Sequence, residues 1–216
     1  MSLIWYIYGA GGLGNETMDI LKTEIELKKI NNHQCIFIDD NLDKEEIFNN
    51  KVISLDNCVE NSKVTIATGE PEVREKLATK CKEKGLKLAT IVSSYSFISK
   101  SVTLGDGVIV APFASIQADA TVSSNVAINT QAIIGHNCSI LDHAVISSQV
   151  NLGGASIVGS KSYIGMAAII REKVLVGNSS IVGMGSVVYK DIPDEVIALG
   201  NPSRVSRRNN DKRVFK

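Results

Sequence analysis

His136 is one of three histidines in this chain of 216 residues. It stands in the run Asn129-Thr130-Gln131-Ala132-Ile133-Ile134-Gly135-His136-Asn137-Cys138. Because it follows two places after an aliphatic that recurs every sixth position, we expect its imidazole to face outward. An imidazole can take up a proton near neutral pH, which suits a general base. The same position also suits an ordinary exposed histidine.

A glycine-rich turn near the start of the chain could hold an anion. Gly9, Gly11 and Gly14 satisfy G-x-G-x-x-G between an apolar run and an amphipathic stretch. Backbone N–H groups at such a turn and helix start bind phosphate. Asp39 and Asp40 end the next apolar run, where they could accept hydrogen bonds from a ribose or a base. We expect a nucleotide-linked ligand here, although the glycines could serve packing alone.

An NAD-dependent oxidoreductase would use the same glycine fingerprint. A dinucleotide normally spans two mononucleotide-binding halves, and only about ninety residues precede a different pattern. We expect strands at 3–8, 35–38 and 64–67, a helix from 71 to about 84, and an extended lead-in at 88–92. These elements make one small Rossmann-like βαβ unit with a parallel sheet.

A six-residue period governs the rest of the chain. Every sixth residue from Ile98 to Val188 is a branched aliphatic, sixteen times in succession, and a small or β-branched residue follows four places after each. This is the spacing of a hexapeptide parallel β-helix, in which three hexads complete one coil. Glycines suit the turns, since glycine tolerates positive φ and close backbone approach. Counting one coil either way predicts Ala118 and Gly154 as the neighbours of His136.

The sequence therefore predicts two domains and a tail. Residues 1–94 form the α/β domain, residues 95–205 form an all-β parallel β-helix, and the basic residues 206–216 form a disordered tail.

Cysteine chemistry and a metal site are not expected. Cys35, Cys58, Cys81 and Cys138 have no C-x-x-C spacing, which fits reduced thiols in the cytoplasm. Cys138 falls in the series of inward corner positions, so we expect a buried structural thiol and not a nucleophile. The three histidines cannot converge on one zinc ion within a chain, because His33 lies in the other domain and His136 and His143 occupy different hexad positions. A metal shared between chains is the remaining alternative.

Charge and hydropathy exclude other partners. Lys plus Arg and Asp plus Glu both number 23, so nothing favours binding to nucleic acid or to an anionic membrane. The apolar run at 3–8 is too short for a signal sequence or a membrane span. We expect a cytoplasmic protein without membrane insertion.

Several runs bring a family into view. They are Tyr6-Ile7-Tyr8-Gly9-Ala10-Gly11-Gly12, Cys35-Ile36-Phe37-Ile38-Asp39-Asp40, Ile66-Ala67-Thr68-Gly69, Asn129-Thr130, Gly135-His136-Asn137-Cys138 and Gly200-Asn201-Pro202-Ser203-Arg204-Val205. On these runs the chain resembles the bacterial sialic acid O-acetyltransferase and UDP-4-amino-sugar N-acetyltransferase family. The resemblance implies a left-handed β-helix, a homotrimer with active sites between subunits, and a nucleotide-sugar-binding domain in front.

The resemblance also implies roles for individual residues. His136 is expected to be the general base, with Asn137 and Asn129 at the reacting centre. The nucleotide-sugar is expected near Gly11, Gly12, Leu13, Asp39, Asp40 and Gly69. The co-substrate acetyl-CoA is expected in a groove between subunits near Val145, Gly154, Met166 and Met184.

Two positions depart from the family pattern. Asn137 stands where members commonly have an acid. A carboxylate stabilises an imidazolium, whereas an amide only orients a tautomer. Asp119, one coil below, could supply the missing charge. Val145 stands where some members have a second histidine.

The expected reaction is acetyl transfer from acetyl-CoA to a nucleotide-linked 4-amino-4,6-dideoxy sugar for bacterial surface glycan synthesis. Sialic acid O-acetylation is an alternative, and a noncatalytic nucleotide-sugar-binding protein is another. Asn137 favours the amine acceptor, because a hydroxyl would depend more on a strong base. The choice among UDP, dTDP, GDP and CMP carriers stays open, as does the glycan pathway.

Overall fold

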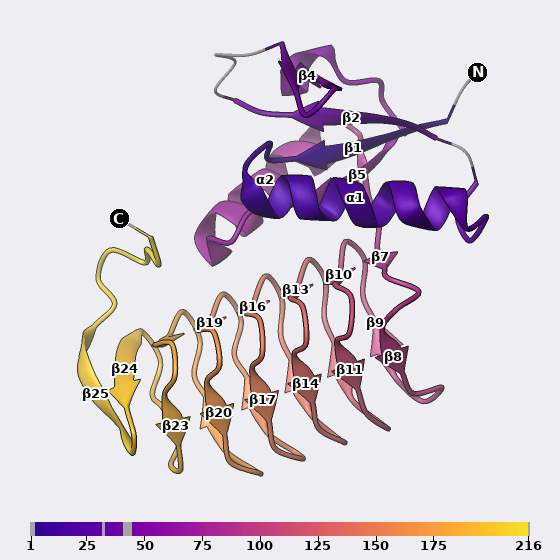
Figure 1. The fold of residues 1–216 in the computed structure, drawn as a ribbon. Coiled ribbons are helices and arrows are strands. Elements are labelled where there is room, and N and C mark those ends of the chain that lie inside the picture. Colours follow the sequence, from indigo (N-terminus) through magenta and orange to yellow (C-terminus); the bar gives the residue numbers. More distant parts are fainter. Residues whose placement is uncertain (1–2, 32, 41–44, 216) are drawn as a thin grey trace.

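The computed structural model describes residues 3–31, 33–40 and 45–215. An α/β domain lies above a parallel β-helix in Figure 1, and the fold class predicted from the sequence is confirmed. The elements of the α/β domain are β1 (Ile4–Tyr8), α1 (Gly12–Glu26), β2 (Gln34–Ile38), β3 (Glu46–Ile47), β4 (Asn50–Ile53), a 3-10 turn (Leu55–Asn57), β5 (Lys63–Ile66), α2 (Pro71–Glu83) and β6 (Lys87–Leu88).

The α/β domain is built on a six-stranded sheet of order β3-β4-β2-β1-β5-β6, parallel except for the antiparallel pair β3–β4. Successive residues of β1 face opposite sides of this sheet. Ile7 packs with Met18 of α1, and Tyr6 packs with Leu77 of α2. The side that carries α1 also faces the β-helix, so α1 lies between the two domains (Figure 1).

The β-helix has three sheets, which we call walls 1, 2 and 3. Wall 1 contains β7 (Ile91–Val92), β10 (Ile109–Val110), β13 (Ala127–Ile128), β16 (Val145–Ile146), β19 (Tyr163–Ile164), β22 (Ile181–Val182), β24 (Val196–Gly200) and β25 (Ser203–Arg208). Wall 2 contains β8 (Phe97–Ile98), β11 (Ser115–Ile116), β14 (Ile133–Ile134), β17 (Asn151–Leu152), β20 (Ile169–Ile170) and β23 (Val187–Val188). Wall 3 contains β9 (Thr103–Leu104), β12 (Thr121–Val122), β15 (Ser139–Ile140), β18 (Ile157–Val158) and β21 (Leu175–Val176).

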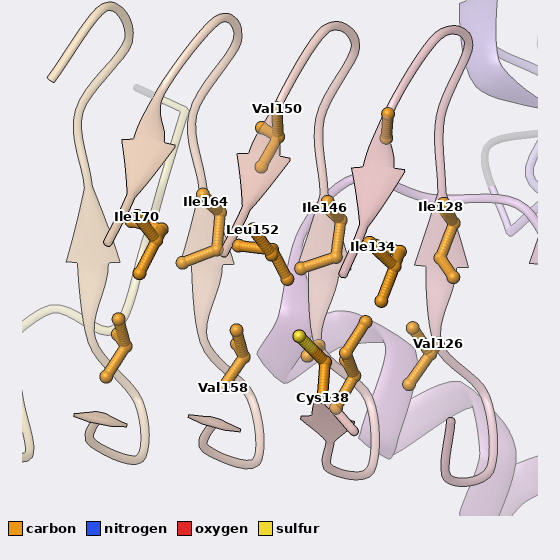
Figure 2. Packing of buried hydrophobic residues seen from close by; sticks show 14 of the residues in the cluster. Val126, Ile128, Ile134, Cys138, Ile146, Val150, Leu152, Val158, Ile164 and Ile170 are labelled. Atoms are coloured by element: carbon orange, nitrogen blue, oxygen red, sulfur yellow. The ribbon is translucent and has the colours of Figure 1, made fainter. Parts of the chain in front are cut away.

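The coils stack in a constant register. Ile134 pairs with Ile116 on one side and with Leu152 on the other, and the partners are 18 residues apart. The recurring aliphatics point inward and form the axis of the β-helix (Figure 2). Ile134 and Ile146 are fully buried, and Cys138 fills an inward corner with no exposed surface. The period predicted from the sequence therefore describes the core.

Glycine has a narrower role in the coils than the sequence suggested. The residue before most inward corner positions has a positive φ, yet non-glycine residues occupy most of these sites, such as Asn137 at 59° and Ala155 at 57°. Gly135 is needed for a different reason. A Cβ atom there would lie 2.7 Å from the carbonyl oxygen of Leu152 in the next coil. Close approach between coils, more than backbone conformation, explains the glycine.

The structure corrects the expected end of the chain. Residues 206–215 are not a disordered tail, because β25 extends to Arg208 and pairs antiparallel with β24. Asn209 is buried and its side-chain amide donates to the carbonyl oxygen of Ser179 at 2.8 Å. The basic side chains are exposed along this strand, which covers the open edge of wall 1. The β-helix also begins earlier than residue 95, since β7 already belongs to wall 1.

A buried arginine joins the two domains. Arg74 of α2 has no exposed surface, and its guanidinium donates to the carbonyl oxygens of Ile66 and Thr68 at 2.7 and 3.0 Å. It also donates to the side-chain oxygen of Asn125 at 2.8 Å, and the Asn125 amide lies 3.0 Å from Nδ1 of His143. Burial lowers the pKa of Arg74 to about 9, and burial also lowers the pKa of His143. The guanidinium stays charged near neutral pH and ties the loop after β5 to the β-helix.

We expect Asn125→Ala to lower the free energy of unfolding by about 2–4 kcal/mol, because a buried charged donor loses its acceptor. Chemical denaturation measures this loss. Gln131→Ala is the matched control, since Gln131 is exposed and has a similar φ of 61°, against 56° at Asn125. Equal losses in the two variants would show that backbone conformation, and not the Arg74 contact, is responsible.

Candidate active site at a corner of the β-helix

His136 lies at the corner between walls 2 and 3, in the turn from β14 to β15. Its side chain is exposed, as the sequence predicted. Nδ1 of His136 is 2.8 Å from the side-chain oxygen of Asn137. An amide oxygen only accepts hydrogen bonds, so this contact favours the tautomer with the proton on Nδ1. Nε2 then carries a lone pair, which is the form a general base requires.

The coils on either side leave room around this imidazole. The backbone N–H of Asn137 donates to the carbonyl oxygen of Ala118, and that of Ala155 donates to the carbonyl oxygen of His136. Ala118 and Gly154 are therefore the neighbours that the period predicted. A Cβ atom on Gly154 would lie 2.5 Å from Nε2 of His136. The ring of His136 therefore lies against Gly154, in the space that a side chain at this position would fill.

Asn137, and not Asp119, is the partner of His136 Nδ1. Asp119 occupies the equivalent position one coil earlier, and its backbone N–H donates to the hydroxyl of Ser101 at 2.9 Å. The imidazole is thus oriented by a neutral amide in this chain.

Asn129 and the two methionines lie at a different corner from His136, and Val145 lies inside a wall. Asn129 lies at the corner between walls 1 and 2, and its side-chain oxygen is buried without a hydrogen-bond partner among the described residues. Met166 and Met184 lie at that same corner and are 53% and 79% exposed. The strand β14 separates this corner from His136. One chain therefore does not bring Asn129 and the methionines to the imidazole.

Val145 does not lie on an open groove. It belongs to wall 1, is 1% exposed, and packs in the same cluster as Ala10 and Ile20 of the α/β domain. The expectation that Val145 contacts acetyl-CoA is wrong for this structure, because the α/β domain covers the side chain.

A cavity of about 330 Å³ opens beside the corner that carries Asn129. One side is α1, which contributes Leu13, Glu16 and Asp19, and the other side is wall 1 and its corner, which contribute Tyr95 and Thr130. The sequence had pointed only to Leu13 and to the Asn129-Thr130 run. Glu16 and Asp19, two exposed acids three residues apart on α1, could have indicated this cavity from the sequence. Their role could be recognised only from the position of α1 against wall 1.

The glycine turn leaves space at the start of α1. Gly14 has no room for a side chain, because its Cβ would lie 1.9 Å from the carbonyl oxygen of Gly9. A Cβ atom on Gly11 or on Gly12 would meet no neighbouring atom within 4 Å. No side chain caps the helix at Gly11. The open space and the uncapped helix end suit an anionic group.

Both aspartates lie at this edge of the sheet, with different contacts. Asp39 accepts a hydrogen bond from the backbone N–H of Ala10 at 2.9 Å, which holds the glycine turn. Asp40 accepts from the hydroxyl of Tyr8 at 2.8 Å and forms an ion pair with Lys80 at 3.2 Å. Burial, followed by the hydrogen bond to Asp40, raises the pKa of Tyr8. Asp40 is 53% exposed, so its carboxylate is open to a ligand.

Within residues 3–31, 33–40 and 45–215, no group of three or more His, Cys, Asp or Glu side chains is placed to hold a metal ion. No helix in the described part of the chain is long and apolar enough to cross a membrane.

An α/β domain followed by a parallel β-helix is the fold of known acetyltransferase structures. Residues 5–81 match the family model described as the PglD N-terminal domain. This match and the relatives described below support the resemblance to the UDP-4-amino-sugar N-acetyltransferase family.

Three known proteins show the extent of the similarity. GDP-perosamine N-acetyltransferase from Escherichia coli O157:H7 is 26% identical over 124 residues, which are 55% of this chain and 56% of that protein. The chain thus spans little more than half the length of this curated relative. The acetyltransferase domain of PglB from Neisseria gonorrhoeae FA1090, solved with acetyl coenzyme A, has a TM-score of 0.87 at 27% identity, covering 95% of this chain and 100% of that one. PerB from Caulobacter crescentus, solved with CoA and GDP-perosamine, has a TM-score of 0.84 at 25% identity, covering 94% and 97%.

We expect Gly154→Ala to lower turnover roughly 10- to 100-fold, because the added methyl displaces the imidazole from its working position. The nearest atoms to that methyl all belong to the His136 ring, which can rotate, so the melting temperature should change little. Gly153→Ala is the contrasting variant. Its Cβ would lie 2.4 Å from the backbone nitrogen of Glu172, so it should lower the melting temperature. A Gly154→Ala enzyme with unchanged turnover would contradict this account of the site.

Proposed function

We propose that the protein transfers the acetyl group of acetyl-CoA to the amino group of a nucleotide-linked 4-amino-4,6-dideoxy sugar, as a step in bacterial surface glycan synthesis. One observation carries the proposal. His136 is exposed, its Nδ1 is engaged by Asn137, and its ring packs against Gly154, which has no side chain. The N-terminal glycine turn supports a phosphate-bearing acceptor.

The proposed reaction is a direct transfer. The acceptor nitrogen attacks the thioester carbonyl while Nε2 of His136 removes a proton from it. As the tetrahedral intermediate collapses, the carbon–sulfur bond breaks and the CoA sulfur leaves with the proton returned by the imidazolium. Backbone N–H groups stabilise the oxyanion, and Asn137 keeps the imidazole in the required tautomer. Cys138 is fully buried, so the scheme uses no acyl-cysteine.

The proposed ligand contacts follow the placement of the residues. Gly11, Gly12, Leu13, Asp40 and Gly69 surround the nucleotide-sugar, while Asp39 supports the turn. Relatives solved with CoA and with GDP-perosamine favour this pair of substrates. Acetyl-CoA would run past Gly154 and along Met166 and Met184 of an adjacent chain. We propose the cytoplasm as the location, since the four cysteines are free, as is usual for thiols in that compartment.

A complete site requires more than one chain. In a triangular coil the His136 corner lies opposite wall 1, where α1 and the cavity beside Thr130 are found. Wall 2 between these corners presents exposed apolar side chains, including Phe97, Ile133 and Ile169 at 58%, 43% and 48%. We therefore propose a homotrimer in which wall 2 is covered and the His136 corner of one chain faces the Thr130 corner of the next.

We expect His136→Ala to reduce kcat by about 10²- to 10⁴-fold, the usual contribution of a general base. The measurement is mass-spectrometric turnover of acetyl-CoA with GDP-perosamine, with UDP- and dTDP-linked 4-amino-4,6-dideoxy sugars, and with sialic acid. Lys100→Ala is the control, because Lys100 is exposed and occupies the same corner position two coils earlier. Undiminished turnover in His136→Ala would refute the base assignment. Acetylation of sialic acid alone would favour an O-acetyltransferase, and no turnover with nucleotide-sugar binding would favour a noncatalytic protein.

We expect mixed oligomers to recover activity that two inactive variants lack. His136→Ala removes the base, and Gly12→Glu places a negative charge where the phosphate would bind. If the site is shared between chains, random trimers from equal amounts retain about a quarter of the sites intact. Light scattering measures the oligomeric state of the same samples. A monomer, or mixed samples as inactive as each variant alone, would contradict the shared site.

A further inference from the structure

A segment after β25 returns from the end of the β-helix to the α/β domain. This segment, residues 209–215, starts at Asn209, which is 5% exposed. The backbone N–H of Asn209 donates to Glu195 and its side chain donates to Ser179, both at 2.8 Å. In Figure 1 the chain then climbs beside the end of the β-helix towards the α/β domain. The segment is thus anchored at a defined point before it reaches the other domain.

Glu70 holds the far end of the segment. One carboxylate oxygen of Glu70 accepts from the backbone N–H of Val214 at 2.9 Å, and the other accepts from the N–H of Phe215 at 2.6 Å. Hydrogen bonds to an ionised carboxylate are about twice as strong as neutral ones. Glu70 directly follows Gly69, in the loop after β5. The segment is therefore attached to the loop that we assign to the nucleotide-sugar.

The ring of Phe215 lies against this loop. A Cβ atom on Gly69 would be 3.2 Å from the ring, so the absence of a side chain at Gly69 allows the close approach. The ring also forms a T-shaped contact with the ring of Tyr163, with centroids 5.7 Å apart and planes at 84°. Phe215 is nevertheless 54% exposed. An aromatic ring is held in place here while much of its surface faces solvent.

We infer that Phe215 is a nucleotide-binding residue whose exposed face stacks on the base of the nucleotide-sugar. The inference rests on the proposed function and adds to it the group that receives the base. The phosphate-binding turn and the loop at Gly69 lie at the carboxyl ends of neighbouring parallel strands, where ligands of such sheets bind. When the phosphates of a nucleotide bind at that edge, its nucleobase extends to Phe215. Tyr163 and Glu70 act as positioning residues for the ring.

Stacking predicts a specific pattern of losses. Alanine in place of an aromatic that stacks on one base weakens binding by roughly 5- to 100-fold. The lost affinity concerns the nucleotide part of the substrate. Binding of free GDP and of free UDP should therefore weaken as well. The KM for the nucleotide-sugar should rise by a similar factor, whereas kcat and the KM for acetyl-CoA should not change. A role confined to anchoring the segment would instead lower stability and leave nucleotide affinity unaltered.

The experiment is calorimetric titration of GDP and UDP into the full chain, together with steady-state kinetics. Phe215→Ala should weaken nucleotide binding, and Phe215→Tyr should retain it, because the ring is preserved. Val205→Ala is the control, since Val205 is a comparably exposed apolar residue on β25 at 49%. Glu70→Ala tests the attachment. If Glu70 acts by holding Phe215, the variant that combines Glu70→Ala with Phe215→Ala should lose no more nucleotide affinity than Phe215→Ala alone.

The outcomes separate this inference from the proposed function. Nucleotide affinity equal to that of the unaltered chain in Phe215→Ala would overturn the role of the ring and leave the transferase assignment in place. Equal losses for nucleotide and for acetyl-CoA would show a general structural effect and would also overturn it. An unaltered chain that binds neither GDP nor UDP and acetylates no nucleotide-sugar would overturn the proposed function, and the stacking role with it.

Discussion

Parallel pairing between coils 18 residues apart is the constraint on which the rest of the structure depends. Ile134 lies between Ile116 and Leu152 in this register, so every outward side chain has defined neighbours above and below. A shift of one residue would turn the inward aliphatics to the outside of the coil. The same register that buries the core therefore sets the surroundings of His136, with Ala118 on one side and Gly154 on the other. Stability and the geometry of the candidate site rest on one pattern.

The second constraint is the attachment of the α/β domain to wall 1. Apolar packing of α1 and the buried hydrogen bonds of Arg74 hold the glycine turn at a fixed position over the coils. That position lies away from the His136 corner of the same chain. The proposed function therefore combines the nucleotide site of one chain with the base of another. The exposed apolar side chains of wall 2 offer the surface for that association.

The local sequence predicted the structure correctly where the position of a residue depends on its own type and on its near neighbours in the chain. The inward aliphatics, the exposed His136, and the βαβ unit with its glycine turn lie where their patterns predicted. Prediction was poorer where a residue depends on distant segments. Val145 has the outward position of an exposed wall residue, but the α/β domain buries it. Residues 206–215 have the composition of a solvated tail. They are ordered because β25 pairs with β24 and because the Glu70 carboxylate accepts hydrogen bonds from the backbone near the end of the chain.

The sequence by itself determined the β-helix, its coil length and the residue that could act as a base, because a six-residue period admits only one regular stacking. Only the tertiary structure decided which surfaces meet. It showed that Asn137 engages the imidazole, that Asn129 and His136 occupy different corners, and that Phe215 reaches Gly69. The contact between Phe215 and Gly69 joins positions whose separation in sequence carries no period. It arises from how two domains and a returning segment pack, which no local pattern encodes.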